Sequence, residues 1–383
     1  MFIIPLKRIL FTYFLFVTAT GQLSAQNNFK QKIKNSAIYA GIEVGSKGVK
    51  LSVIEVGRNA QKNGIFNILQ DTSINTDFIN FNEPTFNATL NGFSTLYKTA
   101  LMDYKIPATR IFTAVSSGVK VQAEKEKKND WITNLSDSFR KSINEPGRKV
   151  AVIDVLEEAR LSHLGIVPES RRYSTFLIDI GSGNTKGGYF PNGNTNQLRL
   201  FQLTWGTKSA SNEAIKRMED DKSLANYNKH LSRVLAGPAE TEIVYTVNVS
   251  GAYNMSDNIA VSGGISWAVA TLLYPELIEN PVVPVTFSEV QEFTEGIVKN
   301  FKNYSDSSLL KTISDPALDK TTIAKEIKRV HQVFDQRALM SGAGLLLKIM
   351  RQFEGIAEKK QFFLVKNGAV GWISAYVNEN ISK

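Results

Sequence analysis

The chain of 383 residues carries 45 lysines and arginines against 36 aspartates and glutamates, which gives a formal net charge of +9. It contains no cysteine, which excludes disulfides, thiolate metal sites and a cysteine nucleophile. Because the basic residues show neither an aromatic RNA-binding pattern nor helix-turn-helix spacing, the charge favours polyphosphate or a phosphorylated small molecule as partner over nucleic acid; a generally basic, soluble surface would explain it equally well.

The first residues have the layout of a secretory signal peptide. Lys7 and Arg8 precede an apolar stretch at 9–19, and small and polar residues follow. The apolar stretch is shorter than the roughly twenty residues that cross a membrane. We therefore predict that 1–25 is a cleaved signal peptide and that the mature protein is periplasmic or secreted, with no transmembrane segment after its removal. Leu23 is larger than cleavage patterns prefer, so an uncleaved anchor is the alternative.

The elements after this leader suggest two domains, since 358 residues (383 − 25) exceed what one hydrophobic core usually organises. Hydrophobic patterning predicts a hairpin at 37–55, strands at 64–69 and 110–115, and a helix at 93–104. The charged run at 124–128 is predicted to be a solvated helix face or a connector rather than a binding site.

The second half of the chain begins a new unit. The pattern predicts strands at 148–153, 175–180, 244–249, 258–265 and 362–365, and helices at 157–164 and over much of 288–354. No low-complexity linker separates the halves, so we expect the domains to share an extensive hinge.

One short pattern occurs twice. Glu43 begins the stretch E-V-G-S-K-G-V-K, which ends at Lys50, and Asp179 begins D-I-G-S-G-N-T-K, which ends at Lys186. The two acidic residues lie 136 positions apart (179 − 43). This spacing is too long for a solenoid repeat and indicates two related domains.

These two turns are typical of phosphate sites. After a strand that ends in an acidic residue, small residues let successive backbone N–H groups converge on an anion, and a carboxylate at the edge can hold Mg²⁺ through water. A ligand-free glycine turn is the alternative for one loop, but two matching loops favour binding. The predicted metal ligands are Glu43 and Asp179. The predicted phosphate-binding residues are Gly45, Ser46, Lys47, Gly48, Gly181, Ser182, Gly183, Asn184, Thr185, Lys186, Ser262, Gly263 and Gly264.

These motifs resemble those of the exopolyphosphatase and guanosine pentaphosphate phosphohydrolase (Ppx/GppA) family, within the sugar kinase, Hsp70 and actin superfamily. The residues at 41–46 look like the first phosphate loop of the family, those at 177–185 like the second, and those at 152–165 like the stretch that carries a catalytic glutamate. Further similar segments follow in order at 262–264, 337–344 and 368–371.

The resemblance implies a mixed α/β fold of two related actin-like (ribonuclease H-like) domains that flank a phosphate-binding cleft. The expected domains are 36–128 and 129–365, with 366–383 returning to the first. A homodimer is left open.

The implied activity is Mg²⁺-dependent hydrolysis of a terminal phosphoanhydride, with Glu158, or its neighbour Glu157, positioning or activating water. From the pattern alone, both glutamates could simply solvate a helix and pair with Arg160.

The sequence departs from the family pattern where the chemistry is expected. Glu43 replaces the usual aspartate, Lys186 stands where an acidic residue is expected, and Val121 replaces a second acidic catalytic residue. Lys47 and Lys186 could bind phosphate as point charges, or neutralise the two predicted metal ligands and displace the metal. Glu124 could compensate for Val121 if that segment is helical. Val370 also stands where the family tends to have arginine.

Two hypotheses follow. The first is an exported phosphohydrolase that acts on polyphosphate or a similar polyanion. The second is a catalytically silent relative that keeps the cleft for phosphate binding or for a structural role in the envelope. A kinase, chaperone-like ATPase or filament would fit the superfamily, but it fits an exported location badly because ATP is scarce there.

Overall fold

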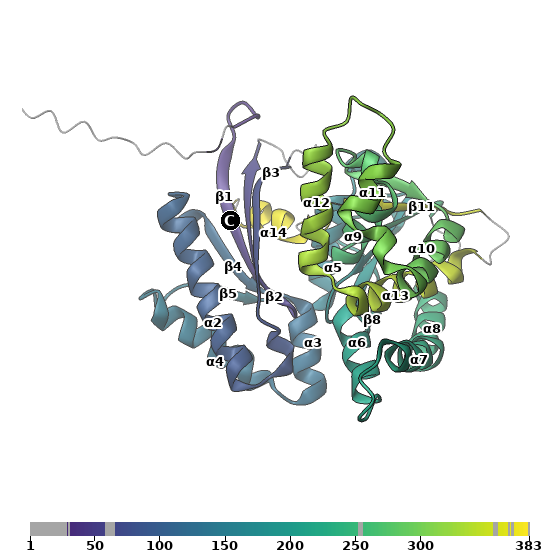
Figure 1. The fold of residues 1–383 in the computed structure, drawn as a ribbon. Coiled ribbons are helices and arrows are strands. Elements are labelled where there is room, and N and C mark those ends of the chain that lie inside the picture. The colour runs from purple at the N-terminus through teal and green to yellow at the C-terminus, as the bar shows by residue number, and fades with distance from the viewer. Residues whose placement is uncertain are drawn as a thin grey trace, which may run out of the picture.

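The computed structural model describes residues 29, 31–57, 66–251, 256–354, 359–366, 368 and 371–381. The predicted leader and Val370 lie outside these ranges. Within the ranges, each helix is too short or too polar to cross a bilayer. The chain forms two units, each built on its own sheet, that lie side by side in Figure 1.

The first unit contains the predicted hairpin and three more strands. Its strands are β1 (Ala37–Val44), β2 (Gly48–Val56), β3 (Phe66–Asn75), β4 (Ile111–Val115) and β5 (Val150–Val152). They are ordered β3-β2-β1-β4-β5, with β3, β2 and β1 antiparallel and β1, β4 and β5 parallel. Because β5 pairs with β4, the first sheet runs past the domain boundary predicted after residue 128.

Helices cover both faces of this sheet. One face carries α2 (Glu83–Lys98), α3 (Ser117–Glu126) and α4 (Asn129–Ser142) (Figure 1). The rings of Phe93 and Phe139 stack at 3.7 Å between centroids and join α2 to α4. The helix predicted at 93–104 begins earlier, because the Asn82 side chain accepts a hydrogen bond from the Thr85 amide at 3.0 Å and caps the first turn.

The second unit repeats this topology. Its strands are β6 (Thr175–Ile180), β7 (Thr185–Tyr189), β8 (Arg199–Leu203), β9 (Asn258–Ser262), β10 (Val282–Val285) and β11 (Gln361–Val365), in the order β10-β11-β9-β6-β7-β8. As in the first unit, three antiparallel strands are continued by two parallel ones, here β9 and β11. The predicted pair of related α/β domains is therefore confirmed.

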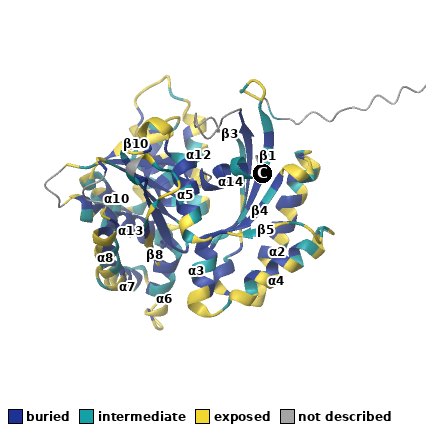
Figure 2. Cartoon of the chain, turned by 180° about the vertical axis from the view of Figure 1, so that it is seen from behind, coloured by how far each residue is buried: buried dark blue, intermediate teal, exposed yellow. Residues whose placement is uncertain are grey.

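The second unit holds most of the helices and the larger core. Its helices are α6 (Thr207–Lys216), α7 (Leu224–Val234), α8 (Glu240–Ser250), α9 (Gly264–Leu273), α10 (Phe287–Lys299), α11 (Asp306–Thr312), α12 (Lys320–Val333) and α13 (Gln336–Glu354). Buried residues fill the sheet and the inner sides of the helices, whereas exposed residues lie on the outer sides of α7, α8 and α10 (Figure 2).

One predicted strand, at 244–249, is wrong. These residues form part of α8, although the run is rich in valine and threonine. Ile243 and Val247 lie one helical turn apart and are fully buried, whereas Val244, Tyr245 and Val249 are exposed. Packing of one helix face against the core overrides the β propensity of the side chains.

Two helices join the units. They are α5 (Val155–Ile166) and α14 (Gly371–Ile381), which pack against each other so closely that a Cβ atom at Gly165 would overlap the carbonyl oxygen of Gly371. On the other side, α14 contacts β1, where a Cβ atom at Gly41 would overlap Ile373. Thus α14 covers the second face of the first sheet, and α5, which packs between α14 and the second sheet, holds Glu158 at the junction.

Candidate functional site

The two repeated turns adopt the same local structure. In the first loop (Gly45–Gly48), the Gly45 amide donates to the Gly48 carbonyl at 2.8 Å. In the second loop (Gly181–Asn184), the Gly181 amide donates to the Asn184 carbonyl at 3.0 Å. The tips of the two turns therefore present short runs of backbone amides between small side chains, the geometry that binds phosphate oxygens.

The two loops meet face to face across the junction of the units. A Cβ atom at Gly183 would overlap Ser46 Oγ and would lie 2.8 Å from the carbonyl oxygen of Gly118. Gln122 of the first unit donates to the Gly183 carbonyl at 2.7 Å. The second loop is thus held directly by side chains of the first unit.

A cavity of about 180 Å³ lies between the loops. It is smaller than the roughly 300–1,000 Å³ of sites for drug-sized ligands, so it suits a phosphate group rather than a nucleotide. A neighbouring cavity of about 460 Å³ shares four lining residues with it: Lys50, Ser73, Gly264 and Val333. The two cavities give room for a phosphate in the first and for the rest of a ligand in the second.

Most of the predicted site residues line the smaller cavity. They are Glu43, Gly45, Ser46, Lys47, Gly48, Glu158, Asp179, Gly181, Ser182, Gly183, Asn184, Lys186, Gly263 and Gly264. Thr185 and Ser262 do not line it: the Thr185 hydroxyl donates to the Trp205 carbonyl at 2.8 Å, and the Ser262 hydroxyl donates to Asp179 Oδ1 at 3.0 Å. Ser262 therefore orients a lining carboxylate.

Three other residues that were considered for catalysis do not line the smaller cavity. Glu157 is bound by Arg160, which also pairs with Glu379 at 2.6 Å, so Glu157 belongs to a link between α5 and α14. Val121 lines a different cavity. Glu124, considered as its replacement, is exposed and lies 4.0 Å from the Lys120 ammonium. The catalytic prediction therefore narrows to Glu158.

A buried ion cluster occupies the floor of the site. Lys186 Nζ lies 2.7 Å from Glu158 Oε1 and 2.8 Å from Asp179 Oδ2, and all three side chains are less than one-tenth exposed. The other Glu158 oxygen accepts a hydrogen bond from the Ser117 amide at the start of α3. Burial lowers the pKa of Lys186, but the two carboxylates outweigh this effect and raise the pKa above its ordinary value. The ammonium therefore stays charged.

The first hairpin contains a comparable pair. Glu43 and Lys50 stand directly opposite each other on β1 and β2, as Asp179 and Lys186 do on β6 and β7. Burial raises the pKa of Glu43 to about 7, against the opposing effect of Lys50. Glu43 therefore exchanges a proton near neutral pH. Lys50 was not among the predicted site residues, although its place in the repeat, seven residues after the acid, could have identified it.

Sequence reasoning also missed lining residues from distant segments, namely Ser116, Gly118, Thr207 and Phe334. The fold brings them to the cavity from the starts of α3 and α6 and from the end of α12.

Lys47, predicted to bind phosphate, also reaches across the cleft. Its ammonium donates to the Val333 carbonyl at the end of α12 and lies 4.9 Å from the centre of the Phe334 ring. Burial lowers the pKa of Lys47 below its ordinary value. A second cross-cleft contact is the ion pair of Lys208 with Asp77 at 2.7 Å. These contacts hold the units in a closed arrangement.

Asp179, predicted to hold Mg²⁺ together with Glu43, is held instead by groups of the protein itself. Both Asp179 oxygens are engaged, one by Ser262 and one by Lys186, and both Glu158 oxygens are engaged as well. Among the residues that the structure describes, no group of three histidine, aspartate or glutamate side chains has the arrangement of a metal site. The ammonium of Lys186 stands where a cation between the two carboxylates would be needed.

The titration of Glu43 makes a stability prediction. Its pKa rises from 4.5 to about 7 on folding, so the folded state binds the proton more tightly. Protonation of Glu43 therefore stabilises the folded state, and this effect is complete below pH 4.5. The contribution to the free energy of unfolding, at most about 3 kcal/mol, is lost as the pH rises through about 7. Glu43→Gln should therefore match the wild type near pH 4 and be more stable at pH 8, as measured by urea unfolding at each pH.

Glu55→Gln serves as the opposite case. Although burial raises it, hydrogen bonds from Ser36, Asn67 and two backbone amides bring the pKa of Glu55 down to about 2. This variant should be less stable than the wild type at pH 7, and the difference should shrink as the pH falls towards 2. A difference between Glu43→Gln and the wild type that does not change with pH would contradict the assignment.

The comparisons with known proteins concern the fold. No protein-family profile and no curated protein sequence matches this chain. Among solved structures, a Ppx/GppA family member from Aquifex aeolicus has a TM-score of 0.58 at 16% identity and covers 91% of this chain and 98% of its own. An exopolyphosphatase-like protein has a TM-score of 0.60 at 14% identity, with coverage of 91% and 100%.

An exopolyphosphatase from Cytophaga hutchinsonii gives a TM-score of 0.53 at 12% identity, with coverage of 90% of this chain and 98% of its own. Alignment over nearly the whole of both chains shows a shared architecture, while activity depends on the site. The chain therefore has the two-domain, actin-like fold of the Ppx/GppA proteins, as the resemblance of its motifs implied.

Proposed function

We propose that this protein is an exported phosphohydrolase that removes the terminal phosphate from polyphosphate or a similar phosphoanhydride. The observation that supports the proposal best is the meeting of two matched glycine loops and Glu158 at one cavity of phosphate size. The location outside the cytoplasm belongs to the proposal and depends on the leader predicted at 1–25.

The two cavities offer polar groups for the terminal phosphate and for the phosphates that follow it in the chain. The terminal phosphate would lie between the loop tips, where backbone amides and the ammonium groups of Lys50 and Lys186 neutralise its charge. The neighbouring cavity, which Lys50 and Arg329 also line, would take the remaining phosphates. Phosphoryl transfer needs this placement and charge neutralisation more than it needs a covalent nucleophile.

Two carboxylates are available for the attacking water. Glu158 is held by Lys186 and the Ser117 amide, so its position is fixed and it would orient the water. Glu43, with a pKa of about 7, would accept the proton. The water oxygen then bonds to the terminal phosphorus, the bridging P–O bond breaks, and the shortened chain leaves with the electron pair of that bond.

The test is phosphate release by residues 26–383 from long-chain polyphosphate. We expect turnover by the wild type and a loss of about 10²-fold or more in Glu158→Gln, because misplacing the attacking water by about 1 Å costs that much. Glu157→Gln is the matched control, because Glu157 lies next to Glu158 on the same helix, pairs with Arg160 and does not line the cavity. Equal activity in the wild type and Glu158→Gln would refute the role of Glu158.

The second candidate is a catalytically silent phosphate-binding protein. It is favoured by Val121, which stands at the position of an expected catalytic acid and lines another cavity. In that case polyphosphate should raise the Tm without releasing phosphate, and Lys47→Glu should reduce the shift. Turnover by the wild type would exclude this candidate.

A further inference from the structure

Each of the two loops is built with its own lysine beside its acid. The register places Lys50 opposite Glu43 and Lys186 opposite Asp179, in both cases across the turn that presents the loop. The second pair is in direct contact at 2.8 Å, and Lys186 also bonds Glu158 at 2.7 Å. The arrangement is therefore a repeated feature of both units rather than an isolated ion pair.

We infer that Lys186, with Lys50 as its counterpart in the other unit, is a fixed cation that takes the place of a divalent metal in this cleft. The inference concerns the same cleft as the proposed function and specifies that phosphate binds there without Mg²⁺.

The geometry of the carboxylates carries the argument. A magnesium ion takes near-octahedral oxygen ligands at roughly 2.0–2.1 Å, several of which are usually waters, and is bound by one or two carboxylates. Here the two Asp179 oxygens bond Ser262 and Lys186, and the two Glu158 oxygens bond Lys186 and the Ser117 amide. A metal placed between Asp179 and Glu158 would have to expel the ammonium.

Burial of these three side chains makes the loss of the ammonium still less favourable. The side chains of Lys186, Glu158 and Asp179 are 6%, 1% and 8% exposed. Removing a charged partner from such a cluster leaves carboxylates without compensation, which is strongly unfavourable. The ammonium therefore stays, and two of its three N–H donors serve the carboxylates, which leaves one for a phosphate oxygen at the same cavity.

The first test uses the unmodified protein, residues 26–383, and inorganic phosphate as the probe. We expect Mg²⁺ alone to leave the Tm unchanged, and phosphate to raise it equally in EDTA and in Mg²⁺. A Mg²⁺-dependent rise in Tm that Asp179→Asn removes would overturn the inference. This readout needs no catalytic turnover, so it is separate from the outcome of the polyphosphate assay.

The second test creates the metal site. Lys186→Met should leave Asp179 and Glu158 without a cation, and Mg²⁺ or Mn²⁺ should then stabilise the variant and bind measurably by calorimetry. Lys208→Met is the matched control, because it removes a lysine from the partly exposed ion pair with Asp77 and should gain no metal binding. A folded Lys186→Met that gains no metal binding would contradict the inference.

If Lys186→Met does not fold, the Tm measurement with the unmodified protein decides whether the inference about Lys186 holds. If phosphate fails to bind the unmodified protein under every condition, the proposed function fails, while a gain of metal binding in Lys186→Met would still support the role of Lys186.

Discussion

Gly183→Ala should weaken the binding of phosphate by about tenfold or more, because misplacing a binding group by about 1 Å can cost as much as 10²-fold. Any side chain at this position would overlap Ser46 Oγ and press on the Gly118 carbonyl, 2.8 Å from the new carbon. The serine can rotate, but the backbone carbonyl cannot. The loops must therefore separate, which stretches the hydrogen bond from Gln122 to residue 183.

The measurement is the phosphate-induced rise in Tm as a function of phosphate concentration. Gly147→Ala is the matched control, because a Cβ atom there meets nothing within 4 Å. Adding Ser46→Ala to Gly183→Ala should restore part of the affinity by removing one of the two overlaps. Gly183→Ala with wild-type phosphate affinity would show that loop contact is not needed for binding. The overpacking itself should cost about 1–3 kcal/mol of stability.

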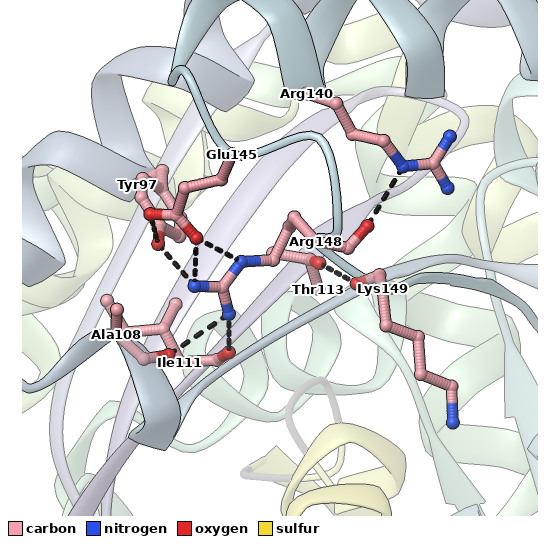
Figure 3. Close-up of polar contacts among 8 residues, drawn as sticks. All are labelled: Tyr97, Ala108, Ile111, Thr113, Arg140, Glu145, Arg148 and Lys149. Carbon is pink, nitrogen blue, oxygen red and sulfur yellow. Dashed lines mark hydrogen bonds and ion pairs between the residues drawn. The ribbon is translucent and has the colours of Figure 1, made fainter.

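Arg148→Met should lower the free energy of unfolding of the first unit by about 1.5–3 kcal/mol, because the guanidinium makes several charged hydrogen bonds in a partly buried network. Figure 3 shows the guanidinium at the centre of a closed network. It donates to Glu145 and to the Tyr97 hydroxyl, and one nitrogen donates to the carbonyls of Ala108 and Ile111, each at 3.0 Å.

This network holds the connection between α4 and β5 against α2 and the start of β4. Tyr97 is 1% exposed, so the hydrogen bond that its hydroxyl accepts from Arg148 could not be replaced by water without opening the core. Although burial raises it, hydrogen bonds from Tyr97 and Arg148 bring the pKa of Glu145 below its ordinary value. Removing the arginine would leave that carboxylate charged and without its cation.

Urea unfolding of Arg148→Met, Glu145→Gln and the double variant would measure the coupling, and the double variant should lose less than the sum of the two. Arg217→Met is the control, since Arg217 pairs with Glu213 on the surface of α6 and such pairs contribute about 0–1 kcal/mol. Equal losses in Arg148→Met and Arg217→Met would contradict the structural role of the network.

The hairpins and their loops could be predicted because they depend on neighbours in the chain. The alternation from Ala37 to Val56, the glycines of each turn and the spacing of acid and lysine are all local patterns, and two copies 136 residues apart indicated two related domains. The helix predicted at 157–164 is α5, which begins two residues earlier because Asp154 caps it by accepting a hydrogen bond from the Glu157 amide at 2.8 Å.

The predictions that were wrong concern residues whose conformation or contacts depend on partners distant in the sequence. The valine-rich segment at 244–249 forms a helix because one face packs on the core. The predicted boundary after residue 128 preceded β5, whose place is set by pairing with β4. Glu157 pairs with Arg160 one turn along the same helix, whereas only the packing of α5 brings its neighbour Glu158 to the cavity.

Local patterns predicted the two glycine loops and most of the elements, because turn chemistry and hydrophobic periodicity act over a few residues. Tertiary structure alone decided the partners of the charged groups. Lys186 could have met a phosphate or the carboxylates, and its contact with Glu158, which lies on another element of the fold, depends on how α5 packs beside β7. Long-range packing and burial, which no local pattern encodes, therefore set the chemistry of the cleft.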